Sequence, residues 1–202
     1  MHLTLPRILF AADFSLAELH AMRLDGETVA LDDAFISVDE PDSPVLRVNA
    51  IRHLMPAKSV VERRSALWVY GALPRPPAVH EFCTQVGGNS RPDNRPRVRV
   101  REVMLREGDT TMVGGAPVTC PVRTAIDWAR TTDDFGQGEA ATLARLCAVH
   151  EITFDACVAR LDRSHGIPNR IRALARLREA CETVRAPGRE SPAAEYGSLS
   201  LR

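Results

Sequence analysis

The spacing of hydrophobic positions changes several times along the chain and separates helix-like from strand-like segments. Near the start, apolar residues recur at helical spacing from Leu16 to Met22, which predicts a short helix. Ser15 and Glu18 occupy the two positions of a capping box at its start, and Gly26 follows at its end. The first element of the chain therefore carries its own start and stop signals.

Two short strands are expected next, at residues 28–31 and 34–38, joined across Asp32 and Asp33. A helix followed by a tight hairpin is the second half of a winged helix-turn-helix, in which the helix enters the major groove and the wing touches the DNA backbone. This wing has two aspartates at its tip, whereas phosphate contact favours Arg or Lys. We therefore interpret residues 1–45 as a small, degenerate winged-helix module that packs within the protein and has lost its phosphate contacts.

The central region begins with a helical signature over residues 59–73, where Gly71 suits a C-terminal cap. A strand is expected at residues 79–86. Further along, Gly114 and Gly115 separate two short strand-like runs and give the clearest hairpin signal in the chain, because two glycines tolerate the positive φ angles of tight primed turns.

A helix is predicted directly after this hairpin. Thr119 is expected to be its N-cap, and Pro121 falls in the first turn, where a missing N–H group costs nothing. Arg123 and Asp127 are four residues apart, so they can pair on one face of the helix.

Three further helices are expected in the last third, at residues 138–150, 153–163 and 169–184. In the third of these, Arg172 and Arg176 are expected to point away from the core. The residues expected on its buried side are Ile171, Leu174, Leu177, Cys181 and Val184.

Composition and charge fit a folded protein with two differently charged parts. Of 202 residues, 45% are hydrophobic, and 26 basic side chains balance 26 acidic ones. Residues 1–50 hold three arginines and nine acids, while residues 51–130 hold thirteen basic side chains and seven acids. This asymmetry places a domain boundary near residue 45. We expect an α+β fold, in which the N-terminal module precedes a domain of short antiparallel strands and a C-terminal helical bundle at 46–186.

The sequence gives no sign of a membrane segment or a disulfide framework. No run approaches the roughly 18 apolar residues that a membrane helix needs. The five cysteines are scattered and include no C-x-x-C pair, which suits free thiols in a reducing compartment. We expect a cytoplasmic protein without a membrane partner.

A row of arginines is the main candidate binding feature. Arg97, Arg99 and Arg101 alternate with valines at period two, which predicts a half-exposed strand over residues 97–105 with guanidinium groups on one face. Together with Arg172 and Arg176, these side chains could meet acidic groups on a partner or nucleic acid. Ordinary solvated surface residues give the same pattern, and for the strand we favour that simpler interpretation.

No catalytic or metal-binding constellation emerges from the residue pattern. Cys147 and His150 share a helical face, but even with Cys157 they lack the fourth ligand and the closer spacing of zinc sites. The contiguous Asp162, Ser164 and His165 cannot bring a nucleophile, base and orienting group into mutual reach. We expect a binding protein rather than an enzyme, with no cofactor and no metal.

The segments RRSALWVYGAL and GGAPVTCPVRTAIDWAR resemble the C-terminal domain of AbiEi-type antitoxins from bacterial type IV toxin–antitoxin systems. The likeness extends over roughly residues 60–185. Its motif residues, each of which can also have an ordinary capping or pairing role, are Ser65, Ala66, Gly71, Thr119, Pro121, Arg123, Thr124 and Asp127.

This resemblance implies an antitoxin that neutralises an AbiEii-like nucleotidyltransferase toxin encoded nearby, with an N-terminal winged helix that represses the shared promoter. The chain departs from the family in its N-terminal part, which offers only a helix and an acidic wing. Contact with promoter DNA would then have to come from the arginines of the central strand or the last helix. The alternative is a DNA-binding transcriptional regulator without a toxin partner. An enzyme remnant is the third possibility.

Residues 187–202 have a second resemblance. Ser191, Pro192 and Glu195 are similar to the opening of a Vsr-like endonuclease domain, so we interpret this tail as the remnant of such a domain's start. Metal-dependent nucleases of that type need paired acids and a lysine near the scissile phosphate, and Lys58 is the only lysine of the chain. Nuclease activity is therefore not expected.

Overall fold

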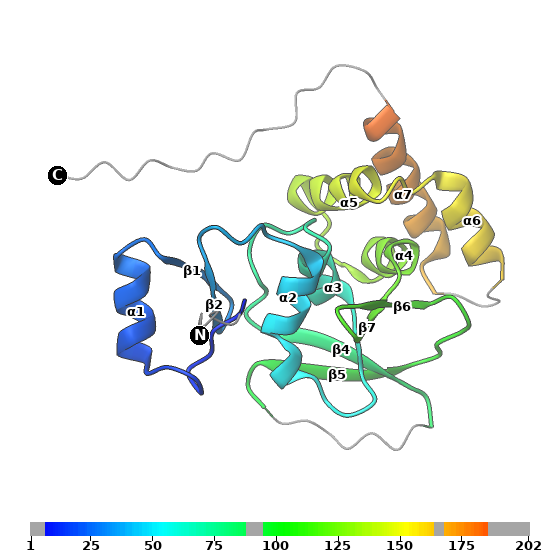
Figure 1. The fold of residues 1–202 in the computed structure, drawn as a ribbon. Helices are drawn as coiled ribbons and strands as arrows, with labels where there is room; N and C mark the ends of the chain where they lie inside the picture. Colours follow the sequence, from blue (N-terminus) through cyan, green and yellow to red (C-terminus); the bar gives the residue numbers. More distant parts are fainter. Residues whose placement is uncertain (1–6, 88–94, 164–167, 186–202) are drawn as a thin grey trace.

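The computed structural model describes residues 7–87, 95–163 and 168–185, and its first elements form a small module. Helix α1 (Leu16–Leu24) is followed by strands β1 (Thr28–Leu31) and β2 (Ala34–Ser37), which pair antiparallel. The capping box is confirmed, since Ser15 and Glu18 bond reciprocally at the start of α1. The hairpin and its two-residue Asp32–Asp33 tip are confirmed as well. The module lies at the edge of the molecule (Figure 1).

Helix α2 (Pro44–Ala50) and a short 3₁₀ helix (Arg52–Leu54) connect the module to the central sheet. We did not predict α2, although its signals are present in the sequence. Ser43 caps it by accepting a hydrogen bond from the Leu46 backbone N–H, and Pro44 occupies its first position.

The central sheet has five strands in the order β5-β4-β3-β7-β6. The strands are β3 (Val60–Val61), β4 (His80–Gln85), β5 (Val98–Val103), β6 (Thr110–Val113) and β7 (Ala116–Thr119). The pairs β3–β4 and β6–β7 are antiparallel, as expected, whereas β4–β5 and β3–β7 are parallel. The sheet is therefore mixed, and our expectation of antiparallel strands throughout was wrong.

The parallel pairing of β3 with β7 involves the segment at residues 59–73, which we expected to be a single helix. Val60 and Val61 form the central strand instead, and α3 (Arg63–Val69) begins only after Glu62. β-branched residues pack well in a buried strand. Once this short strand is in the sheet, β7 reaches its free edge after a long connection and runs parallel to it.

The hairpin between β6 and β7 is confirmed, and Gly114 and Gly115 adopt φ angles of +52° and +77°. A Cβ atom at Gly114 would lie 3.0 Å from the side chain of Val45 and 3.3 Å from that of Val48. The turn therefore needs glycine for its backbone and also for its close approach to α2.

Four helices complete the fold: α4 (Pro121–Thr131), α5 (Gln137–Val149), α6 (Phe154–Asp162) and α7 (Arg170–Arg185). Pro121 is the first residue of α4, as predicted, but Thr119 is not its N-cap. Thr119 ends β7, and Cys120 is the N-cap residue without a side-chain cap bond. The predicted Arg123–Asp127 pair is present, with Nε 2.8 Å from Oδ2.

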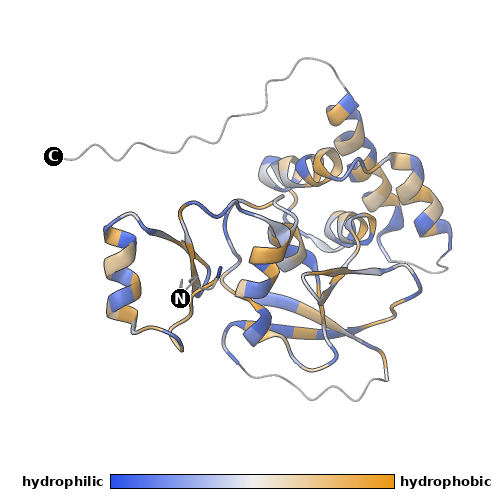
Figure 2. Ribbon diagram, in the orientation of Figure 1, coloured by the Kyte–Doolittle hydropathy of each residue, from blue (hydrophilic) through white to orange (hydrophobic). Residues whose placement is uncertain are grey.

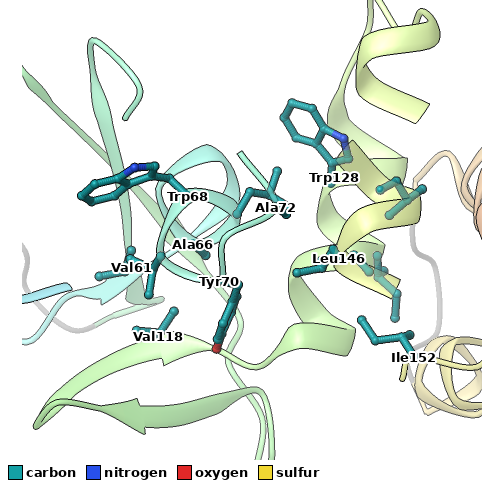
Figure 3. Packing of buried hydrophobic residues seen from close by; sticks show 14 of the residues in the cluster. Val61, Ala66, Trp68, Tyr70, Ala72, Val118, Trp128, Leu146 and Ile152 are labelled. Atoms are coloured by element: carbon teal, nitrogen blue, oxygen red, sulfur yellow. The ribbon is translucent and has the colours of Figure 1, made fainter. Parts of the chain in front are cut away.

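The main hydrophobic core runs from the sheet through α3 into the helical bundle, and two smaller clusters lie apart from it, under α1 and around Val60. Figure 3 shows Val61, Ala66 and Val118 on one side of it and Leu146 and Ile152 on the other. Coloured by hydropathy, the helices of the bundle contain both apolar and hydrophilic residues (Figure 2). The α+β class with an N-terminal winged-helix-like module and a helical C-terminus is confirmed.

The buried side of α7 agrees with our expectation only in part: Leu177 and Cys181 are buried and Leu174 packs against the core, as predicted. Its fully buried residues include Ala173 and Leu177, whereas Ile171 is 87% exposed and Val184 is 42% exposed. The two small alanines at Ala173 and Ala180 allow α7 to pack closely on its neighbours. Arg172 and Arg176 are half-buried and do not point outward as we had expected, whereas Arg178 and Arg185 are exposed. The expected tail at residues 187–202 lies outside the described residues.

Candidate functional site

The two aspartates at the tip of the wing contact side chains of the central sheet. Asp32 Oδ2 lies 3.1 Å from His80 Nε2 on β4, and Asp32 Oδ1 accepts a hydrogen bond of 2.5 Å from Arg97, just before β5. Arg97 also forms an ion pair with Asp33. We call Asp32, Asp33, His80 and Arg97 the wing clasp. It gives the acidic wing a structural role, since the carboxylates hold the module against the sheet.

The core of the wing clasp is buried. The side chain of Asp32 is 3% exposed, and that of His80 is fully buried. Burial would raise the pKa of Asp32, but hydrogen bonds from His80 and Arg97 outweigh it and hold that pKa below its ordinary value. Asp32 is therefore ionised near neutral pH and depends on both partners to compensate its lost hydration.

The clasp continues inward through Ser65, the first residue of the family motif. Ser65 Oγ lies 3.1 Å from His80 Nδ1 and accepts a hydrogen bond of 2.8 Å from the backbone N–H of Glu81. Nε2 can donate to Asp32 while Nδ1 shares a hydrogen bond with the Ser65 hydroxyl, so both ring nitrogens have a partner. Ser65 thus connects α3 to β4 and the wing.

Serine, histidine and aspartate in this order have the composition of a hydrolase triad. Ser65 and His80 are, however, both fully buried, and the serine oxygen already accepts a backbone hydrogen bond. A nucleophile must be able to approach a reacting atom. In this arrangement Ser65 cannot do so, and the relay serves to fix the fold.

A second cluster of charges surrounds Arg101 of β5 and contains three acids that are almost completely buried. Glu62, Asp109 and Asp127 are 1%, 1% and 2% exposed, respectively. Each forms ion pairs with arginines from other elements or from its own helix. We call the cluster the ion-pair network; its members are Glu62, Asp109, Asp127, Arg101, Arg123, Arg130 and Arg160.

Two arginines connect the acids of the network to one another. Arg101 donates to both carboxylate oxygens of Glu62, at 2.5 and 2.6 Å, and lies 3.5 Å from Asp127. Arg123 contacts Asp127 and Asp109, both at 2.8 Å. Bidentate guanidinium–carboxylate pairing fixes geometry as well as charge. The network therefore joins the sheet, the loop before β6 and the helix α4.

The network holds four guanidinium groups against three carboxylates, and the acids lie beneath the arginines. The arginine side chains are 13–28% exposed, whereas the acid side chains are at most 3% exposed. Removing one partner of such a buried pair leaves the other without compensation, at a cost of about 3–5 kcal/mol in fully buried cases.

Burial and the nearby Glu62 raise the pKa of the Cys83 thiol, so this cysteine stays neutral.

The predicted strand arginines have three different environments. Arg97 belongs to the wing clasp and Arg101 to the ion-pair network, so neither is a freely solvated side chain as we had favoured. Arg99 lies between them on β5 and is exposed, and it has no ion pair within the described ranges 7–87, 95–163 and 168–185. Of the row, Arg99 alone is an exposed residue.

The two predicted arginines of α7 close the C-terminal end of α4. Arg176 donates to the carbonyl oxygens of Ala129 and Thr132, at 2.9 and 2.8 Å, and its guanidinium lies 4.0 Å from the ring centre of Phe135. Arg172 donates to the carbonyl of Arg130 at 3.0 Å. These carbonyls have no partner within α4, so the arginines act as a cap from a neighbouring helix.

The remaining motif residues connect α3, β7 and α4. Gly71 follows the last turn of α3 with a φ of +77°. Just before it, the Tyr70 hydroxyl donates to the carbonyl of Thr119 at 2.8 Å. The hydroxyls of Thr119 and Thr124 lie 2.8 Å apart in the buried interior. The motif is thus a set of packing and hydrogen-bonding residues where three elements meet.

Sequence reasoning paired Asp127 with Arg123 but missed the other partners of the arginines in both clusters. Asp32 was noted only as an obstacle to DNA contact, and His80, Glu62 and Asp109 were not singled out. A signal existed for Glu62, because an acid directly after two valines in a strand is placed next to the core. Its partner Arg101 could not be identified, since the pairing depends on the sheet order.

The described part of the chain shows no metal site and no membrane span. No group of three or more His, Cys, Asp or Glu side chains among the described residues could hold a metal ion. Cys147 and Cys157 are buried free thiols, and their pKa values are raised by burial and by Cys181. No described helix combines the length and apolar character needed to cross a bilayer.

Comparison with known proteins places this arrangement in a family. The family model for the AbiEi antitoxin C-terminal domain matches residues 59–186, which include all five strands of the central sheet and helices α3 to α7. A comparison with curated proteins gives no match. Among solved structures, the chain is similar to the RV2827C protein from Mycobacterium tuberculosis, with 16% identity, a TM-score of 0.47, and coverage of 87% of this chain and 72% of that one.

The family match covers more than half of the chain and contains both the ion-pair network and the motif residues Ser65, Gly71, Thr119, Pro121 and Asp127. The resemblance inferred from the sequence is confirmed. This protein belongs to the family of AbiEi antitoxin C-terminal domains.

Proposed function

We propose that this chain neutralises a nucleotidyltransferase toxin encoded beside it. The observation that carries the proposal is the match of its residues 59–186 to the AbiEi antitoxin C-terminal domain. The geometry supports a role in binding, because the buried Ser65–His80–Asp32 relay and the ion-pair network both fix the fold and leave no described group poised for chemistry. Such a protein acts through its surface.

Arg99 is the side chain that we assign to partner contact among the strand arginines. It is exposed on β5, and the flanking Arg97 and Arg101 are held in place by carboxylates. Because those carboxylates compensate both flanking guanidinium groups, Arg99 is the strand arginine whose charge is left to meet an acidic group on a partner. Arg172 and Arg176 contribute by stabilising α4 and α7.

We place the border of the antitoxin domain near residue 45, so that it covers residues 46–186. Val48 and Ile51 support this border, because both are completely buried in the core that also contains α3 and the sheet. The module 1–45 then attaches through the wing clasp.

Co-expression tests the antitoxin role. The toxin from the adjacent reading frame should arrest growth, and this chain should restore it. Arg99→Glu should weaken the rescue, whereas Arg75→Glu, an exposed arginine outside the network, should not. If the wild-type chain fails to restore growth, the antitoxin role is removed. If R99E rescues fully, only the assignment of Arg99 is lost.

Transcriptional autoregulation is the second candidate function, and the helix-plus-hairpin arrangement of α1, β1 and β2 favours it. The wing tip is already paired with Arg97 and His80, so DNA contact would have to come from other side chains. A gel shift on the promoter region, repeated at rising salt, tests it. Tight, salt-sensitive and sequence-selective binding would support regulation, and its absence would remove it.

A further inference from the structure

Helix α1 has an outer face that carries no charged residue although it is open to solvent. The face consists of Leu16, Ala17, His20, Ala21 and Leu24, and we call it the outer face of α1. At 3.6 residues per turn these positions span about 140°; Leu16 lies about 60° around the helix from the buried Leu19, and the His20 ring contacts Phe35 edge-on with 5.6 Å between the ring centres. All five residues are exposed, and Leu16 and Leu24 are 59% and 88% exposed.

This pattern is unusual for a helix at the edge of a protein. Only Leu19 is fully buried in α1, where it packs with Leu9 and Phe35 beneath the helix. A helix that is apolar on both sides is normally covered on both sides. In the described structure α1 lies at the edge of the molecule, with the β1–β2 hairpin on its inner side (Figure 1).

The exposed Ile171 on α7 does not belong to such a face. It is 87% exposed, but Arg178, two turns further along the same side of the helix, is an exposed charged residue. Single exposed apolar residues are ordinary on protein surfaces, whereas contiguous apolar faces with a polar rim mark interaction sites. The outer face of α1 belongs to the second kind.

The charged residues around the outer face of α1 indicate which kind of partner could bind there. The exposed acids nearby are Asp13, Glu18, Asp25 and Glu27, against the single Arg23. Residues 1–50 as a whole hold nine acids and three arginines. Nucleic acid and an anionic membrane would be repelled, and a second copy of this chain would bring the same acidic rim. A basic partner is complementary to this rim.

We propose that the outer face of α1 binds a basic amphipathic helix of a partner protein. The apolar stripe of such a helix would pack between Leu16 and Leu24, and the small Ala17 and Ala21 would let the two helices approach closely. Its Lys or Arg side chains would meet the acidic rim. Recognition through an apolar stripe with flanking charge is a recurrent mode of helix binding. This inference does not depend on the antitoxin role.

The test uses a dye-labelled synthetic peptide of leucine and lysine whose leucines repeat at helical spacing, with the full chain and fluorescence anisotropy as readout. We expect saturable binding that weakens with salt. The double variant Leu16→Gln/Leu24→Gln should bind at least about tenfold more weakly, because it removes the two largest apolar groups of the face. Ile171→Gln, an equally exposed site on α7, should bind like the wild type.

Two control peptides separate this mode from others. A peptide with glutamate in place of lysine, and one of the same composition with leucines in alternation, should both bind poorly. Equal binding of the glutamate peptide, no binding of the lysine peptide, or unchanged binding by L16Q/L24Q would overturn the proposal. So would a concentration-dependent dimer of the wild type that is lost in L16Q/L24Q, because a second copy would then be the occupant. Far-ultraviolet circular dichroism checks that the variants stay folded.

Discussion

Asp32 and His80 are separated by 48 residues in the chain, yet Asp32 Oδ2 lies 3.1 Å from His80 Nε2 in a buried contact between the wing tip and the central sheet. The aspartate that makes this wing unsuited to a DNA backbone is therefore the residue that fastens it to the rest of the protein. A negative charge at this position would oppose contact with DNA phosphates, but here it pairs with His80 and Arg97 inside the protein.

Replacing Asp32 should loosen this joint. In Asp32→Ala, His80 and Arg97 lose their shared carboxylate, and we expect the free energy of unfolding to fall by about 2–4 kcal/mol. The neighbouring Asp33 is 47% exposed, so Asp33→Ala should cost less than about 1 kcal/mol. Urea unfolding of both variants measures the difference. Equal decreases in the free energy of unfolding would show that the buried Asp32 contact stabilises the fold no more than the exposed Asp33 contact does.

Stability should also depend on pH through Asp32. Its pKa is held below the ordinary value of about 3.9, so folding releases a proton from this group and its contribution is complete above that value. The contribution is lost as the pH falls through the lowered pKa of the folded state. In urea unfolding between pH 6 and pH 2, the difference between wild type and D32A should therefore shrink only below about pH 4. A difference that stays constant down to pH 2 would contradict this assignment.

Arg176 should contribute to stability through backbone groups rather than through an acid. In Arg176→Met the alkyl packing is largely kept, but two carbonyls at the end of α4 lose their donor, and we expect a loss of about 1–3 kcal/mol. Arg75→Met is the control, because Arg75 is exposed. Thermal unfolding followed by circular dichroism compares them. A loss no larger than that of the control would show that water replaces the guanidinium group at these carbonyls.

The hairpin between β6 and β7 should be sensitive to a single methyl group. Gly114→Ala combines a positive φ with a Cβ atom 3.0 Å from Val45, whereas Gly26→Ala has a positive φ and no atom within 4 Å of its Cβ. Backbone strain alone costs about 1–2 kcal/mol. G26A should lose about that amount, and G114A should lose clearly more. Chemical denaturation of the two variants measures the contribution of the contact to the free energy of unfolding. Similar losses would mean that α2 shifts to accommodate the added methyl group without destabilising the protein.

Local signals in the sequence located many of the elements. The capping box of Ser15 and Glu18, the glycine pair of the hairpin and the Pro121 start of α4 each depend on interactions within a few residues, and all three are confirmed. The same locality explains the confirmed Arg123–Asp127 pair, which needs only a helix.

Properties that depend on distant contacts were not accessible in this way. The parallel pairing of β3 with β7 follows from a two-residue strand that the helical signature concealed. The environment of Arg97 depends on where the wing docks, and that of Arg101 on which strand lies beside β5. A period-two pattern identifies the face of a strand, but it contains no information about what covers that face.

The two-residue strand β3 has a consequence for how this protein forms during synthesis. It occupies the centre of the sheet and pairs with β4, about twenty residues later, and with β7, more than fifty residues later. Until Val118 has left the ribosome, one edge of Val60–Val61 has no neighbour to close it. The halves of the sheet are joined late, so the nascent chain passes through a stage in which its valine-rich centre is open to chaperones, proteases and other chains.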